Sequence, residues 1–418
     1  MNEARHRLSL LLAFVALGGE ACHAIPRSPS LPHLTTASSS SSLSPRRRSA
    51  AQPRALDQVR GGAKTTTTTT TDGPPPLQPS FVATILSMAF GPMLLGQVIS
   101  AAGGRLFGVK VKVKAAAPER WQWCVAACWS ANMIAVAAPG RYDGQAAAAQ
   151  QAKDAVTPRT ANLFSPAGWA FAIWGPIFLG EFLMMLLLTA GPVFFTGSTA
   201  TPDQGGDPFG LFNAKTLANY GRAAAPGWCA GTAAQVLWCG AFRPSVCGPA
   251  LLWLPSLLLA ATGAGLGRAH RALLTLRPPI PDRPLHWTLP PLPPLVNALV
   301  RWPIVLHLGW ISAASLVNAN NWLAKRGTPV GAKTAAAAAS VAAALAVAAY
   351  VYRTTGDALV GFVVCWALAA VRSDGARAAR GVVPDRALAR VNAVVAAGVA
   401  VAFLSLLLKL SKLNCGHL

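Results

Sequence analysis

The feature that most constrains this chain is a series of long apolar blocks separated by short basic or Pro/Gly-rich stretches. A helix needs about 20 apolar residues to cross roughly 30 Å of hydrocarbon. The blocks that approach this length are residues 81–103, 121–138, 166–190, 226–243, 247–267, 302–323, 335–352, 357–371 and 387–410. The first block contains Pro92 and Gln97, so it either spans or lies at the interface. The sequence therefore predicts an all-α, polytopic membrane helix bundle with eight or nine spans in a lipid bilayer.

The composition agrees with a membrane location and excludes other classes. Of the 418 residues, 53% are hydrophobic and 12% are charged. The formal net charge of +22 comes from Lys and Arg in tails and connecting loops, without an aromatic-interleaved basic pattern, so we expect no nucleic-acid partner. The chain has no CxxC pair and no cluster of His residues, so we expect no metal site and no disulfide framework.

The N-terminal part has the composition of an address and a linker. In residues 1–24, basic residues precede the apolar run LSLLLAFVALGG and the small-residue context ACHA, which is typical of a signal peptide cleaved near Ala24. Residues 25–79 are rich in Ser, Thr, Pro and Arg, which predicts disorder. The two segments resemble the two-part plastid address of algae with complex plastids, and so indicate a plastid membrane. The alternative is a secretory signal followed by a lumenal tail, in the endomembrane system.

The connections between blocks predict how the helices are grouped. Residues 80–118 would form an additional N-terminal span and a basic loop. The short connections 243–247 and 353–357 each predict a helical hairpin. Gly263 and Gly267 form a small-xxx-small pair, which predicts the close approach of another helix.

Three stripes of aromatic and polar residues lie deep within their predicted spans at helical spacing. They are Phe171, Trp174 and Phe178; Gln235, Trp238 and Phe242; and Trp310, Ala314, Val317 and Asn318. An aromatic wall beside a small residue and an amide suits a flat, mostly apolar ligand with a few polar edges. Aromatic packing between helices explains the same spacing, so the pattern leaves both interpretations open.

The spacing of Pro166 and Trp174, together with the second and third of these stripes, resembles the second, third and fifth helices of the TspO/MBR family. The segments SPAGWAFAIWGPIFLGE and LGWISAASLVN resemble the longer members, which are called tryptophan-rich sensory proteins. On this resemblance, residues 119–325 form a TspO-like five-helix core, and residues 326–418 form additional C-terminal transmembrane helices.

The resemblance implies a pocket in the bundle that binds a porphyrin, haem or a sterol-like lipid. Trp174 and Trp310 match the pocket tryptophans of the family, and Ala314 matches the small residue beneath the ligand. Gln235 and Trp238 match the wall from the third helix, although the family usually has Asn where this chain has Gln235. A porphyrin or haem is thus expected as a ligand rather than as a fixed cofactor.

Two polar residues within the predicted spans need a separate explanation. Glu181 lies well inside block 166–190, where a charged group costs at least ~2.5 kcal/mol and is functional by default. It either takes part in proton coupling or forms a hydrogen bond between helices. His307 is either a ligand of haem iron or a hydrogen-bonded side chain near a helix end.

These observations leave three functions open. The first is a TspO-like protein that binds a tetrapyrrole or an apolar lipid, in a sensory, transport or regulatory role. The second is a secondary transporter, suggested by Glu181 and the number of spans, although no internal repeat is visible. The third is a membrane assembly factor without a small ligand. A homodimer is compatible with each of them.

Enzymatic chemistry has little support in the sequence. The chain has no nucleotide-binding glycine loop and no span with paired carboxylates. We therefore expect no catalytic residues and do not expect an enzyme.

Overall fold

The computed structural model describes residues 77–101, 105–106, 109–110, 118–143, 156–194, 214–276 and 297–415, all of which lie in the compact unit Thr70–Leu418. The α-helices are α2 (Pro79–Ala101), α3 (Arg120–Ala137), α5 (Trp174–Phe194), α6 (Ala214–Ala241), α7 (Trp253–Thr275), α9 (Trp302–Lys325), α10 (Val330–Thr355), α11 (Leu359–Asp374) and α12 (Asp385–Cys415). The 3-10 helices are η1 (Gly168–Ile173), η3 (Pro249–Leu251) and η5 (Arg377–Ala379), and η4 (Asn297–Arg301) is a π-helical turn. The predicted signal peptide and residues 25–76 of the predicted disordered segment lie outside the described residues.

Each predicted apolar block coincides with one of these α-helices, so the prediction of a polytopic helical membrane protein is confirmed. The boundaries shift most in α6, which begins 12 residues before the predicted start at 226 and contains Pro226 in its interior. After α2, two-residue strands β1 (Arg105–Leu106) and β2 (Val109–Lys110) pair antiparallel. This short hairpin leaves the class unchanged.

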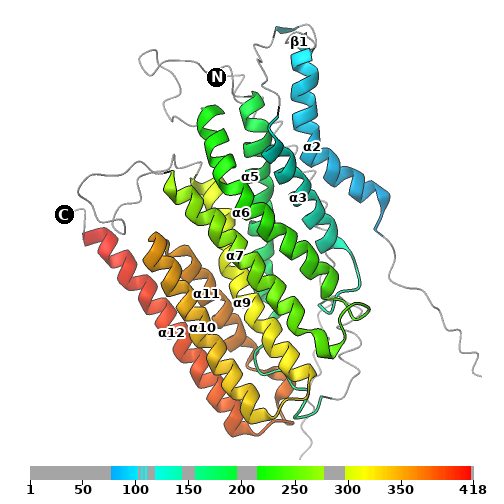
Figure 1. Ribbon diagram of the computed structural model, residues 1–418. Coiled ribbons are helices and arrows are strands. Elements are labelled where there is room, and N and C mark those ends of the chain that lie inside the picture. The colour runs from blue at the N-terminus through cyan, green and yellow to red at the C-terminus, as the bar shows by residue number, and fades with distance from the viewer. Residues whose placement is uncertain are drawn as a thin grey trace, which may run out of the picture. The chain divides into compact units, whose positions relative to one another are not determined.

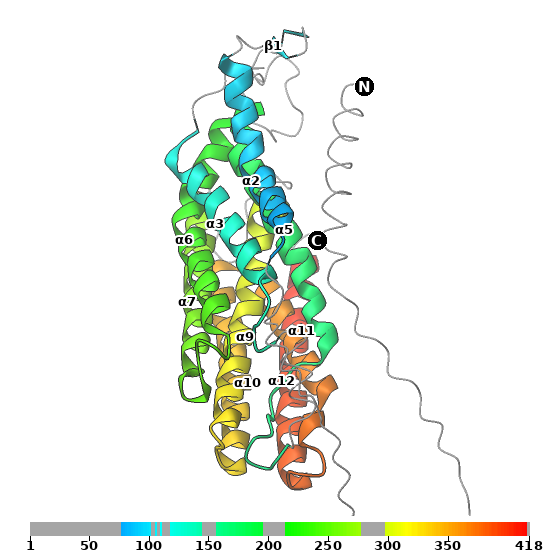
Figure 2. The ribbon, with the colours of Figure 1, turned by 90° about the vertical axis from the view of Figure 1, so that its right-hand side faces the viewer.

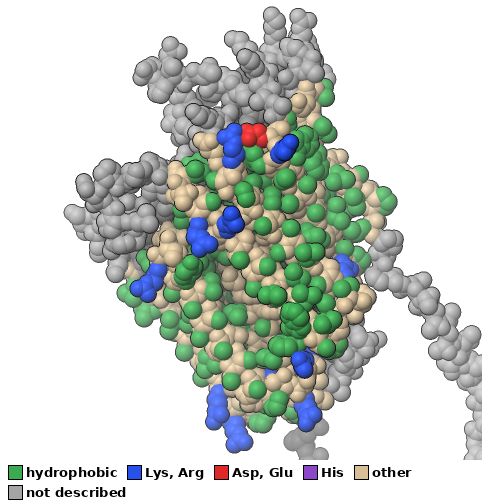
Figure 3. All heavy atoms as spheres, viewed as in Figure 1, with side chains coloured by type: hydrophobic (Ala, Val, Ile, Leu, Met, Phe, Trp, Pro, Cys, Tyr) green, Lys and Arg blue, Asp and Glu red, His purple; other side chains and the backbone are tan. Residues whose placement is uncertain are grey.

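Among the described helices, six are long and apolar enough to cross a membrane, fewer than the eight or nine expected. They comprise Gly168–Gly191, Pro249–Thr275, Ala298–Lys325, Val330–Thr355, Leu359–Ala379 and Asp385–Leu408. Figure 3 shows hydrophobic side chains over most of the viewed face, with Lys and Arg toward the ends of the helices. This distribution suits a surface in contact with lipid.

Helix α9 lies at the centre of the bundle (Figures 1 and 2). It packs against α5 and α7 on the side of the predicted five-helix core and against α10 and α11 on the other side. Within its apolar stretch, 61% of the residues are buried, compared with 22% in α12. Helices α3, α5, α6 and α7 complete the first group, and α2 packs on α3 and α5. The two predicted hairpins, α6 with α7 and α10 with α11, are confirmed.

The close approach of α6 and α7 depends on glycines other than the predicted pair. A Cβ atom on Gly265 would lie 2.4 Å from the backbone nitrogen of Gly231, and one on Gly227 would lie 2.5 Å from the nitrogen of Ala269. By contrast, Gly263 reaches only ordinary contact distance from α9, and nothing lies within 4 Å of a Cβ on Gly267. The prediction was therefore wrong about which glycines bring two helices together.

A buried ionic cluster connects the two groups of helices at the turn between α10 and α11. Asp357 of this turn accepts a hydrogen bond from Nη1 of Arg301 in η4, and its Oδ2 lies 3.3 Å from Nε2 of His270 on α7. The three residues are at most 5% exposed. Gly356 provides the left-handed backbone conformation, with φ of 71°, that the tight turn requires.

Candidate functional site

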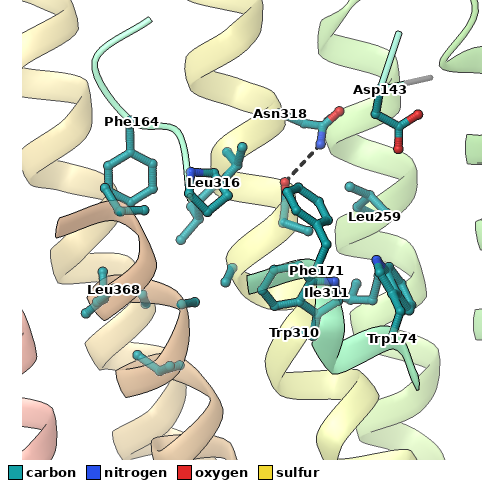
Figure 4. Close-up of a pocket in the computed structure, with 18 of the residues that line it drawn as sticks. Asp143, Phe164, Phe171, Trp174, Leu259, Trp310, Ile311, Leu316, Asn318 and Leu368 are labelled. Atoms are coloured by element: carbon teal, nitrogen blue, oxygen red, sulfur yellow. Dashed lines mark hydrogen bonds between the residues drawn. The ribbon is translucent and has the colours of Figure 1, made fainter. Parts of the chain in front are cut away.

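A cavity of about 130 Å³ lies around α9, between the five-helix core and the hairpin of α10 and α11 (Figure 4). Its walls come from α5, α6, α7 and η1 on one side and from α10 and α11 on the other. The lining residues are Asp143, Phe164, Pro166, Phe171, Trp174, Trp238, Phe242, Leu259, Trp310, Ile311, Ala313, Ala314, Leu316, Val317, Asn318, Ala344, Val364, Ala367, Leu368 and Val371. Almost all of these side chains are apolar, so the cavity suits an apolar ligand.

The structure brings together seven of the nine residues expected to bind a ligand. The seven in the cavity wall are Phe171, Trp174, Trp238, Phe242, Trp310, Ala314 and Asn318. The other two, Phe178 and Gln235, do not line it: Phe178 stacks against Trp174 with ring centroids 4.8 Å apart, and Gln235 is fully buried in α6. Residues far apart in the sequence thus form one wall, and their role in binding stays a prediction.

Aromatic rings meet edge to face in the wall of the cavity. Trp174 and Trp310 lie at 84° with centroids 6.2 Å apart, and Phe171 and Trp310 at 83° and 5.6 Å. Trp238 and Phe242 are stacked, with centroids 5.3 Å apart. Edge-to-face contacts are a favoured aromatic geometry, so the wall is ordered without a ligand.

Several buried polar atoms in the wall have no hydrogen-bond partner among the described residues. They are Nε1 of Trp238, Nε1 of Trp310 and Oδ1 of Asn318, whereas Nδ2 of Asn318 donates to the carbonyl of Ala314 at 3.0 Å. Buried polar groups in proteins are nearly always paired with protein or water. These three atoms belong to side chains of the cavity wall but are themselves fully buried.

The walls from α10 and α11 are the part that sequence reasoning missed. Val364, Ala367, Leu368 and Val371 carry no polar or aromatic signal that would separate them from lipid-facing residues. The connection to this wall is made by η1 and the residue before it. The backbone N–H of Ala167 donates to the carbonyl of Ala370, and the indole of Trp366 donates to the carbonyl of Ala170.

Two basic residues bind groups of the polypeptide that lie next to residues of the cavity wall. Arg141 pairs with Asp143 at 2.9 Å, and its guanidinium lies 5.6 Å from the centroid of the Trp238 ring. Lys333, which is 2% exposed at the start of α10, donates to the carbonyls of Pro158, Arg159 and Ala161 at 2.6–2.9 Å. It thereby holds the segment that leads into Phe164 and Pro166 of the wall.

Glu181 and His307 meet within the bundle. Oε1 of Glu181 lies 2.7 Å from Nδ1 of His307 and accepts a hydrogen bond from Nε1 of Trp228 at 3.1 Å. His307 does not line the cavity; its ring contacts Trp174, which does. Among the described residues, no group of three or more His, Cys, Asp or Glu could hold a metal ion.

Comparison with known proteins assigns the chain to a family. The family model of TSPO-like proteins matches residues 126–408, from α3 into α12. The match includes both groups of helices that line the cavity. No curated protein and no solved structure matches the chain.

Proposed function

Since the chain belongs to the TSPO-like protein family, we propose that it binds a flat, mostly apolar small molecule, a tetrapyrrole or a sterol-like lipid, inside the membrane. The observation that carries this proposal is the convergence of Trp174, Trp238 and Trp310 from three helices on one cavity. Aromatic faces bind flat, mostly apolar rings, so three indoles in one wall favour such a ligand.

The size of the cavity indicates how a large ligand would enter. Its volume of about 130 Å³ is below the roughly 300–1,000 Å³ usual for small-molecule sites. A tetrapyrrole therefore requires the wall to open. Phe171 is 43% exposed and lies in η1, at the edge of the wall, so it is the side chain best placed to move.

The pair of Arg141 and Asp143 beside the cavity suits the carboxylates that distinguish a tetrapyrrole from a sterol. Arg141 lies over the Trp238 ring and is neutralised by Asp143. A ligand carboxylate can replace Asp143 as the partner of this guanidinium. A sterol hydroxyl offers no charge, so Arg141→Gln should weaken binding of protoporphyrin more than that of a sterol.

Proton-coupled transport is the second candidate, because the buried pair of Glu181 and His307 lies next to the cavity. In this role the same ligand would cross the membrane. Uptake into vesicles that is driven by a proton gradient and lost in Glu181→Gln would favour transport over sensing or regulation.

The test is a titration of the full-length, detergent-solubilised protein with protoporphyrin, followed by the absorbance of the porphyrin so that tryptophan substitutions leave the signal unaffected. We expect the double substitution Trp174→Ala/Trp310→Ala to weaken binding at least about fivefold, since each lost stacking contact contributes about 0.5–1.5 kcal/mol. Trp302→Ala is the matched control, because Trp302 begins the same helix as Trp310 but is 48% exposed and outside the cavity wall.

A sterol is titrated in parallel with protoporphyrin. Wild-type affinity in the double variant would contradict the site. The absence of saturable binding of both ligands, together with a stable co-purifying protein, would favour an assembly factor.

A further inference from the structure

A carboxyl group and an imidazole form an isolated pair inside the bundle. Glu181 of α5 and His307 of α9 are both fully buried, and the distance between Oε1 and Nδ1 is 2.7 Å. The indole of Trp228 on α6 donates to the same carboxylate oxygen. Three helices therefore converge on one oxygen atom, although helix packing alone does not require a titratable group there.

Each member of the pair keeps one polar atom without a partner among the described residues. These atoms are Oε2 of Glu181 and Nε2 of His307. A bridge with a purely structural role would be expected to pair all of its buried polar atoms. The unpaired atoms instead leave positions at which a proton or a water molecule can bind.

The pair can take up one proton without breaking its hydrogen bond. With Glu181 ionised and His307 neutral, the pair carries one net negative charge; after one proton is added to either group, it carries none. A net charge is far more costly within a membrane protein than a neutral, hydrogen-bonded pair. Trp228 can donate to the carboxyl oxygen in both states.

No other charged group bonds to this pair in the described part of the chain. Helix α2 and η1 have no titratable residue. The titratable residues of the other elements that pack on α5 and α9 are Arg120, Cys124, Cys128, Lys215, Tyr220, Arg222, Cys229, Cys239, Arg268, His270, Arg271, Arg301, Lys333, Tyr350, Tyr352, Arg353, Cys365, Arg372 and Asp374.

Several of these groups have other partners. His270 and Arg301 contact Asp357, and Arg222 pairs with Glu119. Lys333 binds backbone carbonyls, and Cys128 contacts the carbonyl of Cys229. No ion pair in contact with Glu181 and His307 therefore governs whether this pair is protonated.

Trp174 connects the pair to the cavity. Its indole contacts the His307 ring at 74°, with centroids 5.6 Å apart, and it also lines the cavity and contacts Trp310. His307 and Trp310 are one turn apart on α9. A ligand that stacks on Trp174 thus contacts the neighbour of the imidazole.

We infer that Glu181 and His307 form a proton-binding site whose protonation is linked, through Trp174, to occupation of the aromatic cavity. The inference rests on the proposed function, because it requires a ligand in that cavity. An apolar ligand in the cavity makes the surroundings of the pair less polar, which makes its net negative charge more costly. Ligand binding therefore takes up one proton, and by linkage the affinity rises as the pH falls.

The experiment measures ligand affinity of the full-length protein between about pH 6 and pH 8, where an imidazole ordinarily titrates. Protoporphyrin dimethyl ester is the probe, since its carboxyl groups are blocked. We expect the dissociation constant to fall by up to about tenfold for each unit by which the pH is lowered, if one full proton is taken up. Calorimetry in two buffers with different ionisation enthalpies counts that proton directly.

Two near-isosteric variants locate the proton. Glu181→Gln and His307→Gln should each abolish the pH dependence and the proton uptake while still binding the probe. Glu119→Gln is the matched control, because this acid is largely exposed, pairs with Arg222 and lies outside the cavity wall, and its variant should keep the slope. Thermal melting of each variant distinguishes a loss of folding from a loss of linkage.

The outcomes separate the two proposals. Saturable binding with one affinity at every pH, or a slope that persists in Glu181→Gln, would overturn the proton site and leave the ligand site standing. No saturable binding by the wild-type protein at any pH would overturn the proposed function, and the linkage with it.

Discussion

At the scale of single residues, the described helices contain two buried glutamines with opposite environments. Gln122 of α3 donates from Nε2 to the carbonyl of Thr189 at 3.0 Å, and its Oε1 accepts from the backbone N–H of Glu119 at 2.7 Å. Gln235 of α6 is fully buried, and neither of its amide atoms has a partner among the described residues. An unpaired buried amide lowers stability, so Gln235 lowers the free energy of unfolding of the ligand-free protein.

Gln235→Leu should therefore raise the free energy of unfolding of the ligand-free protein, by up to ~1–3 kcal/mol, because it removes two unpaired polar atoms from the interior. Gln122→Leu should lower it, because it leaves backbone groups of other segments unpaired. Thermal melting in detergent compares the two variants. Equal destabilisation by both would show that Gln235 has a structural partner, such as a bound water molecule.

At the scale of elements, α6 and α7 pack so closely that their backbones touch. Gly227 and Gly231 on α6 face Gly265 on α7, and any side chain at these positions would meet backbone atoms. Because α6 carries Trp238 and α7 carries Leu259, this contact also sets the width of the cavity on one side. Small residues allow such approach in membrane bundles.

Gly265→Ala should lower the melting temperature and weaken ligand binding. Its Cβ would lie 2.4 Å from the nitrogen and 2.6 Å from the Cα of Gly231, so the helices must move apart. We expect the free energy of unfolding to fall by about 1–3 kcal/mol. Gly267→Ala on the same helix is the matched control: it has open space and should be neutral or slightly stabilising. A Gly265→Ala variant as stable as Gly267→Ala would contradict the close packing.

At the scale of the whole molecule, the C-terminal helices belong to the site. The hairpin of α10 and α11 supplies one wall, η1 docks on α11, and Lys333 of α10 holds the segment before η1. The five-helix unit 119–325 would have an open side without them. This arrangement agrees with a family match that continues to residue 408.

A chain that ends after Lys325 should therefore fail to bind protoporphyrin, even where the shortened protein remains helical. Circular dichroism gives the helix content and the porphyrin titration gives the binding. Binding by the shortened chain at wild-type affinity would show that α10 and α11 are dispensable for the site.

The ionic cluster at Asp357 predicts how acid affects the association of the two groups of helices. Burial works against the charged carboxylate, but the His270 and Arg301 side chains outweigh it and hold the pKa of Asp357 below its ordinary value. Because the pKa is lower in the folded than in the unfolded chain, the carboxylate stabilises the fold above the unfolded value of about 3.9. This stability is lost as the pH falls through the folded value.

We expect the melting temperature of the wild-type protein to fall as the pH decreases below about 4. In Asp357→Asn the cluster should contribute no such acid dependence, but stability at neutral pH should fall by about 3–5 kcal/mol, because Arg301 loses its buried anionic partner. Glu119→Gln is the control, since the Glu119–Arg222 pair is largely exposed. Identical acid profiles of wild type and Asp357→Asn would contradict this role.

The sequence by itself determined the class, the approximate position of each described α-helix and the hairpins, because hydrophobic length and short connections act locally along the chain. Helical spacing also predicted one stripe of Phe171, Trp174 and Phe178, but Phe171 lies in η1 and Phe178 does not line the cavity. What the tertiary structure decided was which stripes meet. Three features join residues from different helices. They are the contacts of Glu181 with His307 and Trp228, the contact of Gly231 with Gly265, and the wall from α11. Such contacts depend on the rotation and depth of each helix in the bundle, and an apolar stretch in a membrane protein carries no amphipathic signal that fixes them.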